Sequence, residues 1–107
     1  MFQFTVSFFS DIVGFTEMSS QMDARKVHSL LDRLYAKFDD LSVQHDVYKV
    51  ETIGDAFMAV SNLVKDQTMD HTKRIAQFAI DAIEVANQTM IDVDDPSKGC
   101  VRIRVGL

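Results

Sequence analysis

The chain lacks most of what stabilises secreted and membrane proteins. Its 107 residues include a single cysteine, Cys100, so an internal disulfide framework is excluded. No apolar run approaches the roughly 20 residues that a membrane-spanning helix needs, and residues 2–9 are too short and too often interrupted by polar side chains for a signal peptide. We therefore expect one globular domain that makes no membrane contact through this segment.

Basic charge is scarce as well. Eleven Lys and Arg residues stand against sixteen Asp and Glu residues, which gives a net charge of -5. A domain that binds a nucleic acid duplex normally shows a basic surface, so nucleic acid is not an expected partner. An acidic chain can still bind phosphate groups where metal ions bridge its carboxylates to the phosphate oxygens.

Hydrophobic periodicity predicts how strands and helices alternate. Apolar and polar residues alternate in the stretches 2–10, 47–51, 56–61 and 101–105, which is typical of strands. Helices are predicted at residues 15–20, from the N-cap Asp23 to Leu41, and at about 71–90, where an acidic turn with Pro96 ends the helix. The order β-α-α-β-β-α-β predicts an α+β fold of the ferredoxin-like (palm-type) class, an antiparallel sheet with helices on one face.

The other face of that sheet is expected to lie open. Counting along residues 47–51, Tyr48 and Val50 would face the core. The open face would carry the following side chains: Phe9, Asp11, Lys49, Glu51 and Phe57. Exposed aromatic rings on such a face need a partner or a ligand, so we expect a dimer.

Two aspartates stand at the ends of predicted strands, each close to a glycine. Asp11 follows the first strand, and Asp55 follows Gly54 in the hairpin of residues 47–61. Two carboxylates at adjacent strand ends can hold two divalent cations roughly 3.5–4 Å apart. The turn after Asp11 exposes backbone N–H groups that suit phosphate oxygens, and Gly14 allows a close approach. Taken singly, either aspartate could instead cap a helix or close a turn.

Two motifs carry a resemblance to a known family. Residues 8–16 (FFSDIVGFT) and 47–58 (VYKVETIGDAFM) closely resemble the two N-terminal signatures of class III nucleotidyl cyclases of the guanylyl cyclase type. The resemblance extends over essentially the whole chain, including residues 31–35 and 101–106. It implies that Asp11 and Asp55 bind two Mg²⁺ or Mn²⁺ ions per site, with help from the backbone carbonyl of Ile12. It also implies that a turn contacts the triphosphate through Gly14, Phe15 and Thr16.

Glu51 predicts which base is bound. A carboxylate accepts hydrogen bonds from the N1 and N2 donors of guanine, whereas the N1 acceptor of adenine would leave it unpaired. Guanylyl cyclases resemble this chain in having Glu at this position, where adenylyl cyclases typically have Lys. In the family this residue reads the base in a site completed by the other subunit's aspartates, which implies a homodimer that binds GTP. The alternative is a solvated Glu51 paired with Lys49.

The resemblance implies that residues 1–107 are the N-terminal portion of a single cyclase catalytic domain, with its C-terminal part absent. Family members continue beyond the position of Leu107 with a second base-reading residue and with the Asn and Arg that stabilise the transition state. We therefore expect this chain alone to have little or no activity. The implied parent domain is cytoplasmic, serves signal transduction, and converts GTP to cyclic GMP and pyrophosphate; its parent protein could be membrane-anchored or not.

Three other functions stay open. An adenylate cyclase is disfavoured by Glu51. A catalytically inactive cyclase-homology module, which would dimerise and regulate a partner, would have no use for Asp11, Asp55 and Glu51 together. Another palm-type transferase, such as a diguanylate cyclase, would carry a Gly-Gly-Asp/Glu-Glu-Phe signature, which the chain lacks.

Overall fold

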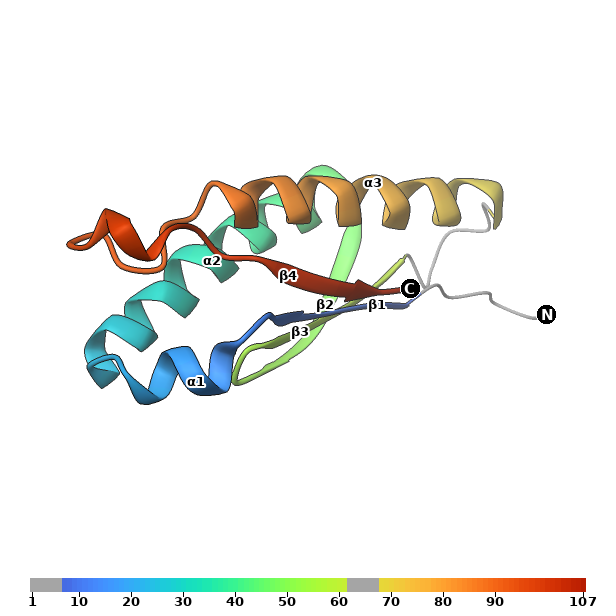
Figure 1. Cartoon of the computed structure of the whole chain (residues 1–107). Coiled ribbons are helices and arrows are strands. Elements are labelled where there is room, and N and C mark those ends of the chain that lie inside the picture. Colours follow the sequence, from blue (N-terminus) through green and yellow to red (C-terminus); the bar gives the residue numbers. More distant parts are fainter. Residues whose placement is uncertain (1–6, 62–67) are drawn as a thin grey trace.

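A computed structural model describes residues 7–61 and 68–107, with the backbone alone for residues 68–72 (Figure 1). The elements follow the predicted order, with one added 3₁₀ helix, η1. Their bounds are β1 Ser7–Ile12, α1 Phe15–Ser20, α2 Ala24–Gln44, β2 Val47–Ile53, β3 Ala56–Ser61, α3 Thr68–Asn87, η1 Pro96–Lys98 and β4 Ile103–Gly106. Residues 2–6 of the first predicted strand and residues 62–67 of the predicted loop lie outside the described residues.

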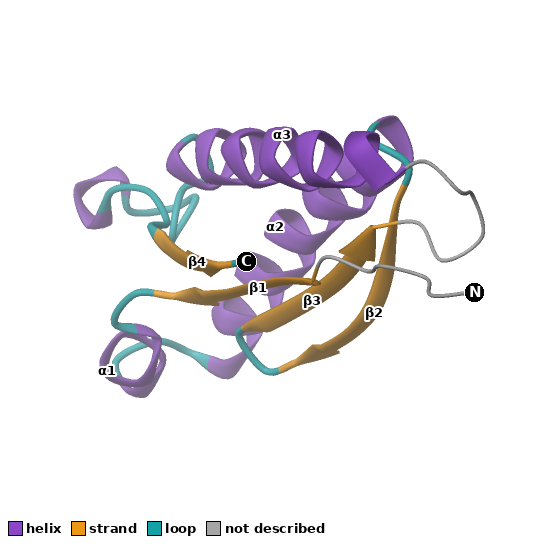
Figure 2. Cartoon of the chain, turned by 90° about the vertical axis from the view of Figure 1, so that its right-hand side faces the viewer, coloured by secondary structure: helices purple, strands orange, loops and turns teal. Residues whose placement is uncertain are grey.

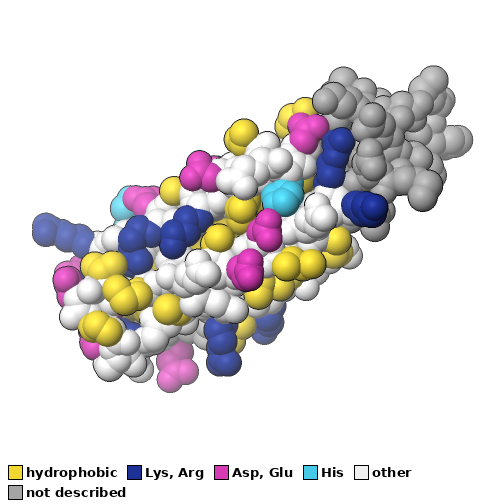
Figure 3. All heavy atoms as spheres, turned by 90° about the horizontal axis from the view of Figure 1, so that it is seen from above, with side chains coloured by type: hydrophobic (Ala, Val, Ile, Leu, Met, Phe, Trp, Pro, Cys, Tyr) yellow, Lys and Arg dark blue, Asp and Glu magenta, His cyan; other side chains and the backbone are white. Residues whose placement is uncertain are grey.

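The strands form one antiparallel sheet in the order β2-β3-β1-β4. Helices α2 and α3 lie side by side on one face of this sheet, as predicted, while α1 follows the end of β1 (Figures 1 and 2). Seen from the helix side, the outer surface mixes side chains of both charges with scattered hydrophobic ones (Figure 3). No helix in residues 7–61 and 68–107 is long and apolar enough to cross a membrane.

Four phenylalanines fill the space between the sheet and the two helices. Phe8, Phe38, Phe57 and Phe78 are all fully buried, and the ring centroids of Phe8 and Phe78 lie 4.8 Å apart, edge to face. The prediction that Phe57 lies on the open face is therefore wrong. Phe57 pairs with Ser10 in the β1–β3 register, and cross-strand partners share a face, so it joins Phe8 under the helices.

A β-bulge in β2 decides which way its side chains point. Lys49 pairs with Ala59, Glu51 pairs with Met58, and Val50 is the extra residue between the two pairs. Because an extra residue resets the alternation, Lys49 and Glu51 lie on opposite faces of the sheet. Glu51 is on the open face, as predicted.

The other predicted orientations in β2 are wrong. Tyr48 is 45% exposed and Val50 is 55% exposed, so neither faces the core, whereas Val47 is buried. Lys49 lies on the helix-covered side, where its ammonium is 3.4 Å from a carboxylate oxygen of Asp39 in α2. Since β2 is an edge strand with a bulge, a simple period of two does not describe it.

Helix α3 ends at Asn87 rather than at about Met90, and Pro96 opens η1 instead of ending α3.

The segment between α3 and β4 is held by basic side chains from one side of α2. The bonds are Lys26 Nζ to Asp92 Oδ2 at 2.9 Å, Arg33 Nη1 to the Met90 carbonyl at 2.7 Å, and Lys37 Nζ to Thr89 Oγ1 at 2.9 Å. The hydrogen bond from Lys26 holds the pKa of Asp92 below its usual range. These bonds fix the path of the chain into β4.

Candidate functional site on the open face

The predicted site residues gather on the open face of the sheet and at the ends of its central strands. One cross-strand row joins Asp11 of β1 to Arg104 of β4. The next row joins Glu51, Met58, Phe9 and Gly106 across all four strands. Successive rows on one face are two residues apart, so Asp11 and Glu51 belong to neighbouring rows.

Asp11 is held by a two-pronged ion pair. Arg104 donates from Nε to Oδ1 at 2.8 Å and from Nη2 to Oδ2 at 3.2 Å, so both carboxylate oxygens are engaged. The pair is open to solvent, with side-chain exposures of 42% for Asp11 and 70% for Arg104. The hydrogen bond that Arg104 donates to Asp11, together with the negative charge of Asp11, raises the pKa of Arg104, and the charge of Asp55 adds to this.

Asp55 is held by a backbone amide instead of by a charged side chain. Gly54, with a positive φ of 55°, forms the tight turn between β2 and β3 with Asp55. The Oδ2 atom of Asp55 accepts a hydrogen bond from the Ile12 amide at 3.2 Å, across a sequence separation of 43 residues. Asp55 therefore lies beside the end of β1, next to Asp11, and the turn brings the two predicted metal ligands and Ile12 together.

Tyr35 of α2 supports this turn. Its hydroxyl donates to the carbonyl of Gly54 at 2.9 Å. Burial raises the pKa of Tyr35, and the nearby charge of Asp55 raises it further. Nothing in the local sequence indicates this bond, because it joins two residues that are 19 positions apart.

The turn from β1 into α1 lies directly after Ile12 in the chain. Gly14 is the N-cap of α1 in the left-handed conformation, with φ of 71° and no side-chain cap. Phe15 packs against the edge of the core, while Thr16 is exposed. The predicted triphosphate-contacting residues Gly14, Phe15 and Thr16 thus lie at the same end of β1 as Asp11, but no contact in the structure assigns them a ligand.

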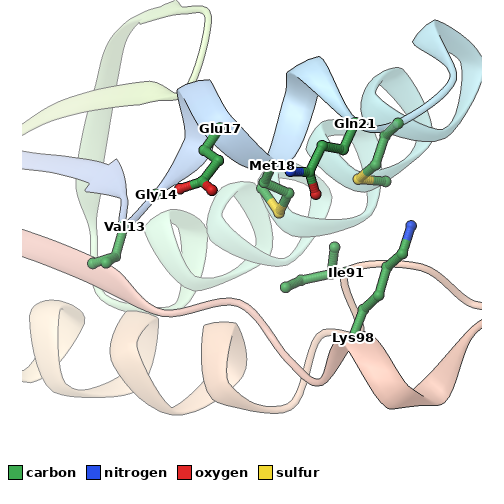
Figure 4. Close-up of a pocket in the computed structure, with 8 residues that line it drawn as sticks. Val13, Gly14, Glu17, Met18, Gln21, Ile91 and Lys98 are labelled. Carbon is green, nitrogen blue, oxygen red and sulfur yellow. The ribbon is translucent and has the colours of Figure 1, made fainter.

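Two hollows flank this region. One, of about 370 Å³, lies on the open face and is lined by the following residues: Phe9, Ser10, Asp11, Ala56, Arg104, Val105 and Gly106. The other, of about 300 Å³, lies between α1 and the segment that carries Lys98 (Figure 4). Glu17 and Met18 of α1 and its C-cap residue Gln21 border it on one side, and Ile91 and Lys98 on the other. Of the predicted metal ligands, only Asp11 lines either hollow.

Glu51 lies apart from Asp11. Strand β3 separates β2 from β1, so standard sheet spacings put the Cα atoms of Glu51 and Asp11 on the order of 12 Å apart. The side chain of Glu51 is exposed and makes no hydrogen bond or ion pair within the described part of the chain. The alternative pairing with Lys49 is wrong, because Lys49 lies on the other face and pairs with Asp39.

The donor set at the end of β1 suits a hard divalent cation. Mg²⁺ and Mn²⁺ prefer oxygen ligands, and Asp11, Asp55 and the Ile12 carbonyl supply only oxygen. Over residues 7–61 and 68–107, no group of three or more His, Cys, Asp or Glu side chains is placed so that it could hold a metal ion by itself. A metal here would complete its coordination with water and phosphate oxygens, as Mg²⁺ commonly does.

Comparison with known proteins identifies a common family. The model of the adenylate and guanylate cyclase catalytic domain matches residues 3–107. The chain is 43% identical over 107 residues to retinal guanylyl cyclase 2 of Bos taurus, covering 99% of this chain and 9% of that protein. It is 42% identical over 99 residues to an adenylate cyclase of Mycobacterium bovis, covering 92% of this chain and 21% of that protein.

A solved structure shows the same fold. The guanylate cyclase domain of RhGC from Catenaria anguillulae, in complex with GTP, superposes with a TM-score of 0.81 at 33% identity. The match covers 95% of this chain and 53% of that domain. The chain therefore spans about half of a solved cyclase domain, and only 9% and 21% of the two curated relatives. The resemblance and the palm-type fold expected from the sequence are both confirmed.

Proposed function

The chain belongs to the adenylate and guanylate cyclase catalytic domain family, and we propose that it is the metal-binding and base-reading part of a guanylate cyclase. The reaction proposed is the conversion of GTP to cyclic GMP and pyrophosphate. The observation that carries the choice of GTP is Glu51, an exposed carboxylate on the open face without a partner in the described part of the chain. Such an acceptor matches the N1 and N2 donors of guanine.

In this reaction the ribose 3′-hydroxyl attacks the α-phosphorus in line and pyrophosphate leaves. Asp11, Asp55 and the carbonyl of Ile12 would hold two Mg²⁺ or Mn²⁺ ions, which when bound lower the pKa of the attacking hydroxyl and neutralise the leaving group. The turn that begins at Gly14 would orient the triphosphate through its backbone N–H groups. The hydrogen bond between the Ile12 amide and Asp55 supports this assignment, because it fixes one carboxylate beside the other before any ligand arrives.

An adenylate cyclase is the second candidate. A specific observation favours it: the mycobacterial adenylate cyclase is 42% identical to this chain, practically as similar as the retinal guanylyl cyclase at 43%. Overall similarity therefore does not decide the substrate, and the choice depends on Glu51. An adenine N1 acceptor facing this carboxylate would leave both groups without a donor.

We propose that the partner is a second copy of the chain. The open face exposes large apolar side chains, with Phe9 at 50%, Tyr48 at 45% and Ile53 at 60%. Exposed apolar groups on one sheet face are typical of an interface. A homodimer would also let Glu51 of one copy serve the aspartates of the other, which suits their separation within one chain. A regulatory module without catalysis would need the same interface but neither aspartate.

The proposal is tested by titrating the 107-residue chain with a non-hydrolysable GTP analogue and Mn²⁺. The ATP analogue is the control ligand, and the double variant Asp11→Ala/Asp55→Ala is the control protein. We expect Mn²⁺-dependent binding that favours the guanine nucleotide and disappears in the double variant. A preference for the adenine nucleotide would favour the adenylate cyclase. If a folded dimer binds neither nucleotide, the chain acts only as a scaffold and the proposed nucleotide site is contradicted.

A further inference from the structure

We propose that the hollow of about 300 Å³ between α1 and the segment 91–98 binds a small organic monocarboxylate with an apolar body. We call this space the α1 hollow. Binding there needs neither metal nor nucleotide. Its effect on the turn at Gly14 rests on the proposed function, because that turn is proposed to orient the triphosphate.

The two walls of the α1 hollow are held unequally. On one side, the Ile91 amide donates to the Gly99 carbonyl at 3.0 Å, and Arg33 donates to the Ile91 carbonyl at 3.3 Å, so the segment that carries Lys98 is tied down. On the other side, α1 has only six residues, and none of them is buried. A short helix with so little burial shifts at little cost, and a ligand that fills the space beside it would hold it in place.

The lining combines an apolar surface with a few polar groups, as small-molecule pockets commonly do. The apolar part is supplied by four side chains that the protein's own packing leaves at least partly exposed: Val13, Met18, Met22 and Ile91. The flexible thioethers of the two methionines can adapt to an alkyl or aryl group. Figure 4 shows Lys98 extending from the opposite wall toward the side where Gln21 lies, while Glu17 lies near Gly14.

Lys98 is the cation that an anionic ligand would meet. Its ammonium is 3.5 Å from an oxygen of Asp92, whereas Lys26 bonds the same oxygen at 2.9 Å. Asp92 therefore keeps its stronger partner when Lys98 turns to a ligand, and the weaker pair costs little to release. A single lysine balances the charge of a carboxylate but not that of a phosphate dianion.

Glu17 limits the ligand to one negative charge. Its side chain is exposed and makes no hydrogen bond or ion pair within the described residues. A second anionic group at this end of the α1 hollow would meet the uncompensated carboxylate of Glu17 and be repelled. A monocarboxylate whose charge lies at Lys98 and whose apolar body lies against the methionines fits both ends.

The α1 hollow adjoins the proposed nucleotide site. Gly14 lines it and is also the N-cap of α1, and the Met18 amide donates to the Gly14 carbonyl at 3.0 Å. The Val13 amide is tied to the Arg102 carbonyl at 2.8 Å. An occupant that holds α1 against the segment 91–98 therefore also fixes the turn at Gly14. A turn that is already fixed binds a triphosphate at a smaller entropic cost.

The experiment titrates the isotope-labelled chain with octanoate, without metal or nucleotide, and follows the backbone amides by NMR. Butyrate and hexanoate test the apolar body, and octanol, which has the same chain length without the charge, tests the carboxylate. Lys98→Gln is the test variant. Lys73→Gln is the matched control, because Lys73 is an exposed lysine of α3 that does not line the α1 hollow. Circular dichroism checks that each variant is folded.

Octanoate should shift the amide resonances of the lining residues, those of Gly14, Met18 and Ile91 among them. Each methylene added from butyrate to octanoate should tighten binding by up to about fourfold. Lys98→Gln should weaken octanoate about two- to fivefold and leave octanol unchanged, whereas Lys73→Gln should leave both unchanged. Gln21→Trp, at the exposed C-cap of α1, should fill the space and abolish binding, and it carries the test if Lys98→Gln does not fold.

A second titration measures the coupling to the turn at Gly14. The GTP analogue is added at saturating Mn²⁺, with and without saturating octanoate. We expect octanoate to tighten binding of the analogue about fivefold, and linkage then requires the analogue to tighten binding of octanoate by the same factor.

The outcomes separate the ligand site from the proposed function. If octanoate shifts none of the lining amides in the folded chain, the site is overturned. If octanol binds as tightly as octanoate and Lys98→Gln changes neither, the α1 hollow takes apolar groups in general, such as a side chain of a protein partner, and the carboxylate is the wrong ligand. If octanoate binds but leaves the affinity for the analogue unchanged, the coupling is overturned. If the chain binds no nucleotide with or without octanoate, the proposed function fails, whereas the first titration alone decides the carboxylate site.

Discussion

The two faces of this sheet are built from the same strands but held in opposite ways. On the covered face, Phe8, Phe57 and Ile12 are packed under α2 and α3 and nearly or fully buried. On the open face, Glu51 and Phe9 are exposed and Asp11 is partly exposed, and within the described residues the Asp11 side chain is held by a solvent-exposed ion pair with Arg104. Because side chains alternate along a strand, one face supplies stability while the other is left free for chemistry. Substitutions on the two faces should therefore separate stability from binding.

The largest effect is expected from Phe57→Ala on the covered face. Removing a fully buried ring leaves a cavity and should lower the free energy of unfolding by about 3–5 kcal/mol, a large share of the stability of such a domain. Urea denaturation measures this loss. Phe9→Ala is the matched control, since Phe9 pairs with Met58, the next residue in β3, but lies on the open face. Phe9→Ala should lower the free energy of unfolding by about 1 kcal/mol or less.

Equal losses for the two variants would contradict the division between the faces. One further result would sharpen it. If Phe9→Ala destabilises the chain more at high protein concentration than at low, a second copy covers Phe9, because association links stability to concentration.

A smaller effect is expected where the covered side reaches the site. Tyr35→Phe removes the hydroxyl that donates to the carbonyl of Gly54 and should cost about 0.5–1.5 kcal/mol of unfolding free energy. Because this bond braces the turn that carries Asp55, Mn²⁺ affinity should fall as well. Tyr48→Phe is the control, since Tyr48 is exposed and its hydroxyl makes no hydrogen bond within residues 7–61 and 68–107. If Tyr35→Phe lowers stability but leaves Mn²⁺ affinity unchanged, the hydrogen bond from Tyr35 is not needed to position Asp55.

The same comparison explains what the sequence could predict. Local signals sufficed for the element order, for the bounds of α1 and for the N-cap Asp23, because capping and helical stripes depend on near neighbours. They failed where the answer depends on pairing between distant strands. The bulge at Val50 and the burial of Phe57 depend on how their strands pair with neighbouring strands, and the local sequence pattern holds no information on that pairing.

The site shows the same limit. Asp11, Asp55 and Glu51 were found from motifs, and their faces or turns agree with the structure. The ion pair between Arg104 and Asp11 was not found, because it joins residues 93 positions apart through the β1–β4 register. Tyr35 was missed for a similar reason. Motifs predict which groups should touch a ligand, whereas the side chains that hold those groups in place emerge only from the tertiary structure.

The smallest effect on stability is expected at Glu51, on the open face of the edge strand. Glu51→Gln keeps the shape of the side chain, and since Glu51 has no partner in the described part of the chain, the free energy of unfolding should change by less than about 0.5 kcal/mol. Binding should respond strongly. A charged acceptor of guanine donors contributes about 1.5–3 kcal/mol, so the preference for the GTP analogue over the ATP analogue should fall by about 10- to 100-fold. The ratio of the two dissociation constants at saturating Mn²⁺ measures it.

Lys49→Gln is the control that ties this result to the faces of the sheet. Lys49 stands two residues from Glu51 in the chain, but the bulge turns it to the covered side, where it pairs with Asp39. Its substitution should leave the nucleotide preference unchanged and lower stability only slightly, because the pair is partly exposed. If Glu51→Gln and Lys49→Gln alter the preference alike, the effect is one of net charge near the nucleotide. If only Glu51→Gln alters it, the carboxylate reads the base, and the extra residue Val50 is what separates the reader from its charged neighbour.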